Sequence, residues 1–166
     1  MKKIFIHSFK TQWGLFRLAA TQKGLVIVTL PGEREKYFQD RISKFFPEYE
    51  IYNGGQLNKK AASQINAYLH RDLKRFKLPL DIRGTEFQRK VLKKVAQIPF
   101  GATMTYGEIA EAIGKPKAYR AVGSANAKNN LPLVIPCHRV VASHGLGGYG
   151  GGLKLKKKLL KLEGAL

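Results

Sequence analysis

The chain has 166 residues, 44% of them hydrophobic, which suffices for one domain or for two small domains with buried cores. No apolar run approaches the roughly 20 residues that span a bilayer, so we expect no membrane-embedded segment. Thirty Lys and Arg against 11 Asp and Glu give a formal net charge of +19. This charge favours nucleic acid as a partner and an anionic membrane surface second, although a Lys-rich surface serving only solubility is the alternative.

The cellular compartment is suggested by the N-terminus and by the cysteine count. Residues 1–7 are basic and then apolar, as in a signal peptide, but polar residues interrupt the run from Ser8 onward and no small-residue cleavage site follows. Cys137 is the only cysteine, which excludes an internal disulfide and agrees with a reducing compartment. We therefore expect a cytoplasmic protein.

The first 80 residues predict a small α/β domain. Short β-rich runs at 3–6, 14–19 and 24–30, punctuated by glycine and polar residues, predict an antiparallel meander. Helices are expected at about 33–46 and 59–69, with a loop at Asn53-Gly54-Gly55 between them. The apolar face expected for the first helix comprises Tyr37, Phe38, Ile42, Phe45 and Phe46. The extended stretch 77–84 is the predicted linker to a second domain at 81–166.

The second half predicts mostly helices. Thr85 and Gln88 fit a capping box that opens a helix ending before Pro99. A second helix follows, and the stretch 115–117, with Pro116, makes a turn into a third. The apolar residues of these two helices recur at i, i+3, i+4 and i+7: Tyr106, Ile109, Ala110 and Ile113, then Ala118, Ala121, Val122 and Ala125. Two short helices joined by a tight turn predict a helix-turn-helix, and the charge makes DNA the leading partner.

The third of these helices is rich in small residues. Its expected exposed face offers long side chains, and little side chain covers the backbone between them. The long ones are Lys117, Tyr119, Arg120 and Lys128, and the small ones are Ala121, Gly123, Ser124 and Ala125. Such a helix could enter a DNA minor groove with one cation reaching inward. The alternative, that small residues only allow close helix packing, is equally consistent with the spacing.

A last helix is expected at 153–162, with Leu155, Leu159 and Leu162 on one face and lysines on the other. At 100° per residue Glu163 falls on the apolar arc, where a carboxylate is costly without a partner. His138 is the partner we expect, and a Glu–His pair could polarise a thiol. A frayed, solvated Glu163 is the alternative.

Cys137 stands in the sequence Ile135-Pro136-Cys137-His138-Arg139-Val140. A lone cysteine is often a small buried hydrophobe, but a neighbouring imidazole and a basic environment lower the pKa of a thiol and make it reactive. We interpret Cys137 as a nucleophile whose pKa is lowered by its electropositive surroundings.

Several motifs together resemble the O6-alkylguanine-DNA alkyltransferases, also called methylated-DNA–protein-cysteine methyltransferases. The resemblance is close over roughly residues 85–164 and concerns only the layout of the first 80. Its motifs are Pro136-Cys137-His138-Arg139-Val140, Asn129, the Gly-rich stretch 147–152 with Leu153, Tyr106-Gly107-Glu108, Arg120-Ala121-Val122-Gly123 and Leu162-Glu163-Gly164. It implies an α+β fold: an N-terminal α/β domain with a ribonuclease-H-like sheet, then a mostly helical domain with the helix-turn-helix and the site.

The resemblance also implies roles for individual residues. Cys137 would take the alkyl group irreversibly from O6-alkylguanine, with O4-alkylthymine left open as a second substrate. His138 would be a water-linked base and Glu163 its orienting carboxylate. Tyr106 would crowd the target phosphate and donate a proton to guanine, Arg120 would fill the gap left by the extruded base, and Asn129 would brace the active-site turn. The implied pocket residues are Val140, Pro132, Tyr149 and Gly150, with the carbonyls of Cys137 and Val140 reading the guanine amino group.

The implied partner is double-stranded DNA containing alkylated bases. The resemblance also implies a monomer that needs no cofactor and does not bind a membrane. Some relatives hold zinc in the first domain, but His7 and His70 without a cysteine predict no such site here. Tyr119, Asn130 and Gly150 depart from the residues usual in the family. Three other hypotheses remain: a damage sensor without transfer, a helix-turn-helix regulator with a structural Cys137, and, more distantly, a cysteine hydrolase.

Overall fold

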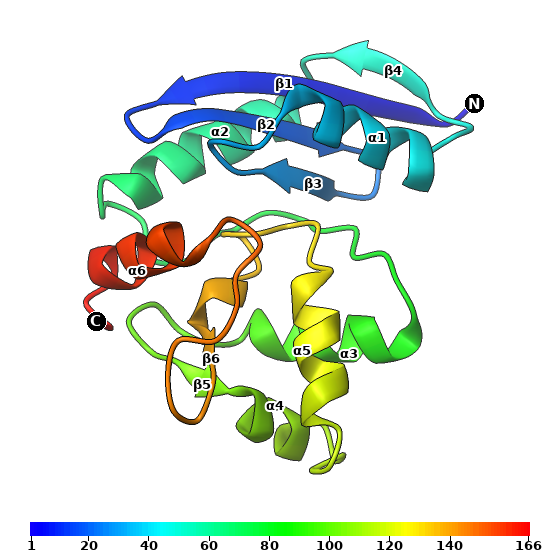
Figure 1. The fold of residues 1–166 in the computed structure, drawn as a ribbon. Coiled ribbons are helices and arrows are strands. Elements are labelled where there is room, and N and C mark those ends of the chain that lie inside the picture. The colour runs from blue at the N-terminus through cyan, green and yellow to red at the C-terminus, as the bar shows by residue number, and fades with distance from the viewer. The chain divides into compact units, whose positions relative to one another are not determined.

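The computed structural model describes residues 1–166, which form two compact units, Met1–Asp81 and Ile82–Leu166. Figure 1 shows the strands and helices of each. The first unit is a sheet with two helices, and the second consists mainly of helices. The fold is therefore of the mixed α+β class that the sequence predicted. No helix is long and apolar enough to cross a membrane.

The first unit is built on a four-stranded sheet in the order β3-β2-β1-β4. Strands β1 (Lys3–Thr11), β2 (Gly14–Ala20) and β3 (Leu25–Thr29) form the predicted antiparallel meander. Gly14 adopts a φ of +121° at the β1–β2 turn, a conformation that favours glycine. Strand β4 (Glu50–Asn53) pairs parallel to β1, and it lies in the stretch before Gly54 that the sequence did not mark as a strand. All four of its residues are exposed, so no alternation marked it.

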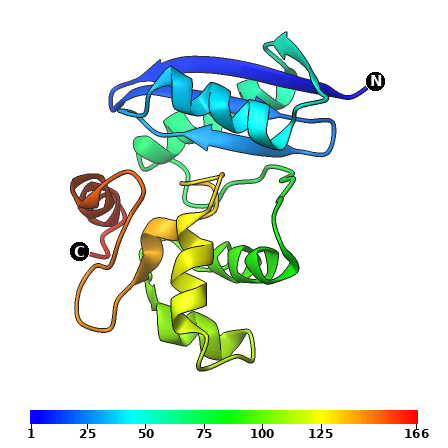
Figure 2. The ribbon, with the colours of Figure 1, turned by 45° about the vertical axis from the view of Figure 1, so that its right-hand side comes forward.

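Helices α1 (Glu35–Phe45) and α2 (Gln56–Leu69) cover opposite faces of this sheet (Figures 1 and 2). Phe38, Ile42 and Phe46 of the α1 segment pack on strand residues including Ile4 and Ile27. Tyr37 and Phe45, which we expected on the same face, remain 46% and 40% exposed, because they lie to one side of the buried stripe. Helix α2 begins three residues earlier than expected, directly after Gly55, whose φ is +92°.

The predicted linker, residues 77–84, begins as an extended segment held against the sheet. The amide of Leu25 donates to the carbonyl of Pro79 and the amide of Asp81 donates to the carbonyl of Leu25, each at 2.9 Å. The Thr21 hydroxyl also donates to the Asp81 carboxylate at 3.0 Å. The first unit therefore keeps its last residues paired to β3 up to its boundary at Asp81.

The second unit contains helices α3 (Glu86–Val95), α4 (Tyr106–Ala112), α5 (Tyr119–Ala127) and α6 (Leu153–Leu162). Thr85 caps α3 in the predicted capping box with Gln88, and Thr105 forms a second box with Glu108 at the start of α4. Helices α3, α4 and α5 pack on one another around buried apolar side chains. These are Val91, Leu92, Val95, Ile109, Ala110, Val122 and Ala125.

Two predicted apolar stripes differ from the structure. Ala121, expected among the packed residues of α5, is exposed. On α6 the buried residues are Lys156, Leu159 and Leu160, whereas Leu155 and Leu162 are only half-buried. The buried stripe of α6 is therefore rotated around the helix axis from the predicted one, and it includes Lys156.

Candidate active site

A short parallel pair of strands brings the start of α4 to the segment that follows Cys137. Strand β5 (Met104–Thr105) pairs with β6 (Val140–Val141). Tyr106, the first residue of α4, comes directly after β5, and the 3₁₀ turn η1 (Cys137–Arg139) comes directly before β6. The predicted site residues Tyr106 and Cys137 are thus placed by one two-stranded ladder, although they lie 31 positions apart in the sequence.

The Cys137 side chain is 6% exposed. Burial raises the pKa of its thiol to about 11, against the opposing effects of a hydrogen bond from Asn129 and the positive charge of Lys156. The expectation that the basic surroundings lower this pKa was therefore wrong, because desolvation outweighs the nearby charge. At neutral pH the resting thiol holds its proton.

His138 is fully buried, and its Nε2 lies 2.7 Å from Oε2 of Glu163. A carboxylate only accepts hydrogen bonds, so Nε2 carries the proton and donates, which leaves Nδ1 with its lone pair. Nδ1 is buried without a hydrogen-bond partner in the protein. Burial lowers the pKa of His138 and the Glu163 carboxylate opposes the shift. The result is a neutral imidazole whose free nitrogen can accept a proton.

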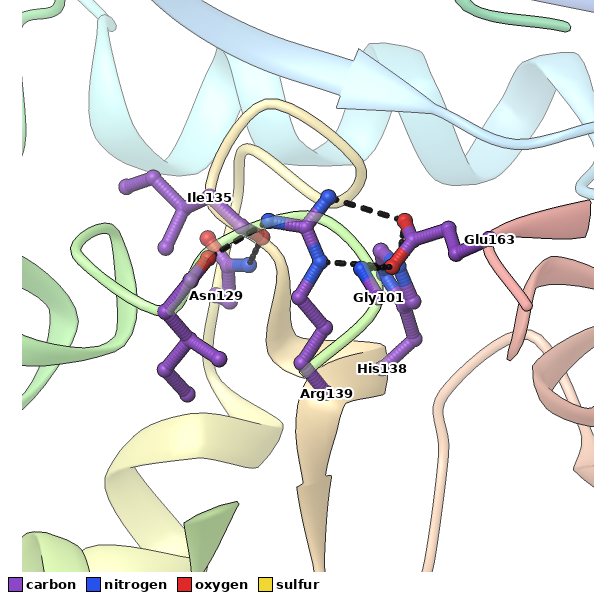
Figure 3. Close-up of polar contacts among 7 residues, drawn as sticks. Gly101, Asn129, Ile135, His138, Arg139 and Glu163 are labelled. Carbon is purple, nitrogen blue, oxygen red and sulfur yellow. Dashed lines mark hydrogen bonds and ion pairs between the residues drawn. The ribbon is translucent and has the colours of Figure 1, made fainter. Parts of the chain in front are cut away.

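Glu163 is 5% exposed at the C-terminal end of α6, so the frayed, solvated alternative is wrong. Its second partner is one that the sequence analysis missed: Arg139 donates from Nε to Oε1 and from Nη2 to Oε2, both at 2.8 Å (Figure 3). The amide of Gly101 also donates to Oε1, at 3.4 Å. The remaining Arg139 nitrogen, Nη1, donates to the carbonyl of Ile98 at 2.6 Å. One buried carboxylate thus ties the 3₁₀ turn and the loop at Gly101 to the end of α6.

Two asparagines brace the turn that carries the cysteine. The Asn129 amide donates to the carbonyl of Ile135 at 2.9 Å and its oxygen accepts from the amide of Leu131 at 2.9 Å (Figure 3). Asn126, on the buried side of α5, donates from Nδ2 to the carbonyl of Cys137 at 3.3 Å. Asn129 was predicted through the family resemblance, whereas Asn126 was not predicted. Its position in the buried stripe of α5, one turn after Val122, was the available signal.

Lys156 is the largest omission of the sequence analysis. Its ammonium is fully buried and donates to the carbonyls of Val140 at 2.7 Å, Gly148 at 2.9 Å and Leu146. Burial lowers its pKa to about 8, with the neighbouring Cys137 opposing the shift. Lys156 therefore fastens the Gly-rich loop to strand β6 beside the cysteine. A single lysine on the apolar arc of a Lys-rich helix gave no distinctive signal.

The Tyr106 ring lies in a slot between two glycines. A Cβ on Gly123 of α5 would lie 3.6 Å from the ring, and a Cβ on Gly147 would lie 2.7 Å from the Tyr106 hydroxyl oxygen. A Cβ on Gly147 would therefore collide with the hydroxyl, and one on Gly123 would lie in van der Waals contact with the ring. Gly123 thus helps to position Tyr106 from its place on α5.

The remaining predicted residues fall into two groups. Arg120, Ala121 and Ser124 of α5 are exposed, as are residues just outside its two ends, Lys117 and Lys128. The implied pocket residues range from buried to exposed: Val140 and Pro132 are buried, Tyr149 is half-buried and Gly150 is exposed. The two carbonyls expected to read guanine already accept hydrogen bonds, that of Val140 from Lys156 and that of Cys137 from Asn126 and the Val140 amide. A carbonyl oxygen has two lone pairs, so both of those at Cys137 are already engaged.

The buried cysteine next to a histidine–carboxylate pair indicates a protein that uses a cysteine nucleophile. Residues 86–165 match the family model described as "6-O-methylguanine DNA methyltransferase, DNA binding domain". The methylated-DNA–protein-cysteine methyltransferase of Methanosarcina mazei is 50% identical over 162 residues, 96% of this chain and 97% of that protein. That of Mycobacterium tuberculosis is 51% identical over 130 residues, 78% of this chain and 75% of that protein.

The solved structures agree with these sequence relatives. The M. tuberculosis protein crystallised in complex with DNA superposes with a TM-score of 0.82 at 35% identity, covering 97% of this chain and 93% of that one. The O6-methylguanine-DNA methyltransferase of the archaeon Pyrococcus kodakaraensis gives a TM-score of 0.70 at 26% identity, covering 97% and 99%. The chain belongs to the methylated-DNA–protein-cysteine methyltransferase family.

Proposed function

We propose that this protein repairs DNA by moving the alkyl group of O6-alkylguanine onto the sulfur of Cys137, once per molecule. The observation that carries the proposal is the buried Cys137 next to a neutral His138 whose Nε2 is held by Glu163. Membership of the methyltransferase family gives the reaction type. Nothing near Cys137 suggests a route for cleaving the resulting thioether, so each molecule is spent after one transfer.

The proposed reaction begins with proton removal from the thiol. The thiolate is the nucleophile, and burial keeps the thiol protonated at rest, since its pKa is about 11. The free Nδ1 of His138 accepts this proton through a bridging water, and Glu163 stabilises the imidazolium that forms. The sulfur then attacks the alkyl carbon, the bond from that carbon to O6 breaks, and guanine keeps the electron pair. The hydroxyl of Tyr106 supplies the proton that guanine takes up.

We propose that α4, the turn at Lys115–Lys117 and α5 form a helix-turn-helix that binds duplex DNA. The exposed face of α5 supports this, because it joins long cations to small side chains. Phosphate contacts fall to Lys117 and Lys128, close approach to the groove to Ala121 and Ser124, and the gap left by the extruded nucleotide to Arg120. Extrusion is needed because the attacked carbon is inaccessible within the duplex.

Three further features belong to this proposal. A ribonuclease-H-like type is proposed for the first unit, and the helices on both faces of its sheet support this (Figure 2). The protein acts as a monomer, because one cysteine per chain completes the reaction. It works in the cytoplasm, where its single unpaired thiol stays reduced.

The test is intact-mass analysis after mixing the protein with duplex DNA that contains one O6-methylguanine. We expect the mass to rise by one methyl group, with peptide mapping placing it on Cys137 and no gain in Cys137→Ser. An unchanged mass, or methyl transfer beyond one equivalent, would refute the proposal. Binding to undamaged duplex should be nearly independent of sequence and fall steeply with salt. A strong preference for one undamaged sequence would instead indicate a regulator.

A further inference from the structure

The second unit exposes three large hydrophobic side chains, Tyr119, Leu153 and Leu166. Tyr119 is the only aromatic one, and 51% of it is exposed. It is the first residue of α5 and directly precedes Arg120. No hydrogen bond, ion pair or ring contact holds its side chain. The fold therefore gains little from this ring, whereas a solvated aromatic surface is what nucleic-acid bases stack on.

Tyr119 lies on the same side of α5 as Gly123, the residue next to Tyr106. Residues four apart lie one above the other on a helix, so Tyr119 lies one turn before Gly123 on the same side. Gly123 is the residue that faces the Tyr106 ring. Tyr119 therefore lies on the side of α5 that faces Tyr106, one turn closer to the N-terminal end of the helix. Arg120 and Ser124 lie on the adjacent side.

The charged side chains around Tyr119 are positive, so this surface suits a polyanionic partner. No Asp or Glu occurs between Ala112 and Leu162, a stretch that contains ten Lys and Arg. Lys115 and Lys117 precede Tyr119 in the turn and are exposed, as is Arg120 after it. The nearest carboxylates in the sequence, Glu108 and Glu111, lie on α4. Exposed aromatics between cations bind unstacked nucleotides, because the cations hold the phosphates while the ring covers a base.

We propose that Tyr119 stacks on a base that loses its neighbour when the damaged nucleotide is extruded, and so stabilises the open duplex together with Arg120. This inference rests on the proposed repair function. Tyr119 then contributes binding energy only in complexes with DNA whose base stacking is disrupted. Intact duplex offers its base faces to no side chain, so Tyr119 adds little to binding there.

The experiment compares Tyr119→Ala and Tyr119→Phe with the wild-type protein on alkylated duplex, undamaged duplex and free alkylguanine. We expect Tyr119→Ala to lower the rate on limiting alkylated duplex at least about fivefold, as loss of one base–aromatic stack would. The rate on free alkylguanine and the affinity for undamaged duplex should stay within about twofold. Tyr119→Phe should match the wild type, because the ring and not the hydroxyl makes the contact. Tyr37→Ala, which removes a similarly exposed tyrosine from the first unit, is the matched control.

A binding arm separates this inference from the proposed chemistry. In the unreactive Cys137→Ser background, Tyr119→Ala should reduce the preference for alkylated over undamaged duplex by a similar factor. If the wild type transfers no alkyl group, the repair proposal fails while this arm still tests the contact. Equal behaviour of Tyr119→Ala and the wild type in both arms would overturn the inference. The inference would also be overturned if Tyr119→Phe were as defective as Tyr119→Ala, or if Tyr119→Ala slowed the reaction with free alkylguanine as much as the reaction with duplex. A change in the self-association of Tyr119→Ala, measured by analytical ultracentrifugation, would overturn it as well.

Discussion

Arg139 and Glu163 form a two-pronged ion pair in which both guanidinium–carboxylate distances are 2.8 Å and both side chains are almost completely buried. The same carboxylate holds His138 at 2.7 Å. Because two parallel N–H···O bonds fix the orientation of the carboxylate relative to the guanidinium, Arg139 fixes the direction in which Glu163 presents its oxygen to the histidine. The ion pair therefore connects the stability of the unit with the alignment of the base.

The first prediction concerns this pair. Arg139→Ala leaves the Glu163 charge buried without its strongest partner, and breaking such a pair costs about 3–5 kcal/mol of unfolding free energy. Urea unfolding monitored by circular dichroism measures the loss. Arg89→Ala is the control, because the exposed Arg89 donates only to the carbonyl of Gly84 and its removal should cost less than about 1 kcal/mol. Similar losses for the two variants would contradict the importance of the buried pair.

The second prediction concerns the charge of Glu163. Glu163→Gln keeps the size of the side chain but no longer stabilises an imidazolium at His138, so alkyl transfer at pH 7 should slow at least about tenfold. The defect should shrink as pH rises toward the thiol pKa of about 11, since hydroxide then removes the proton. The measurement is the rate of reaction with free alkylguanine from pH 6.5 to 10, with folding checked by melting. A defect of constant size would mean that Glu163 matters only for structure.

The third prediction concerns stability at alkaline pH. Burial raises the Cys137 pKa from 9.0 to about 11, so the folded protein holds this proton more tightly than the unfolded chain. The thiol's contribution to stability is thus present below about pH 9 and lost as pH rises to 11. Burial lowers the Lys156 pKa from 10.5 to about 8, so the folded protein releases that proton first and gains stability as pH rises over this interval.

These opposite slopes can be separated by mutation. Cys137→Ser removes the loss and also the thiolate that opposes the Lys156 shift, so its unfolding free energy should rise more steeply with pH between about 9 and 10.5 than that of the wild type. Denaturant melts at half-unit pH steps give both slopes. Parallel curves for the two proteins would show that the thiol titrates alike in the folded and unfolded chains.

The fourth prediction uses two neighbouring glycines. A Cβ on Gly147 would lie 2.7 Å from the Tyr106 hydroxyl oxygen, and Gly147 has a φ of +72°, whereas a Cβ on Gly148 would meet nothing within 4 Å. Gly147→Ala should therefore displace Tyr106 and slow alkyl transfer at least about tenfold, while Gly148→Ala should react within about twofold of the wild type. Transfer rates on alkylated duplex provide the comparison. Equal rates for the two variants would mean that the Tyr106 slot is not needed.

The fifth prediction separates extrusion from chemistry. Arg120 is exposed on α5 and Cys137 is buried, so Arg120→Ala should slow repair of duplex about tenfold or more and leave reaction with free alkylguanine within about twofold. Lys128→Ala, which removes an exposed cation from the other end of α5, is the control for lost charge. Equal losses by Arg120→Ala on both substrates would place Arg120 in the chemical step.

Local sequence patterns determined much of the fold. The capping box at Thr85, the helices α3, α4 and α5, and the meander β1–β3 were predicted, because caps and short-range periodicity involve residues within a few positions of one another. The motif around Cys137 identified the family on the same local basis. Strand β4 was missed, since its four residues are all exposed and only pairing with β1 makes them a strand.

The tertiary structure alone decided the electrostatics of the site. Arg139 reaches Glu163 across 24 positions and Lys156 reaches the Val140 carbonyl across 16, and no local pattern encodes such partners. The net charge of +19 suggested a thiol with a lowered pKa, but the structure buries Cys137 and raises its pKa to about 11. Net charge sums over a solvated surface, whereas the pKa of a buried group depends on desolvation and on the few groups that touch it. That difference is why the sequence identified the nucleophile and its family, and only the folded chain revealed its resting protonation state.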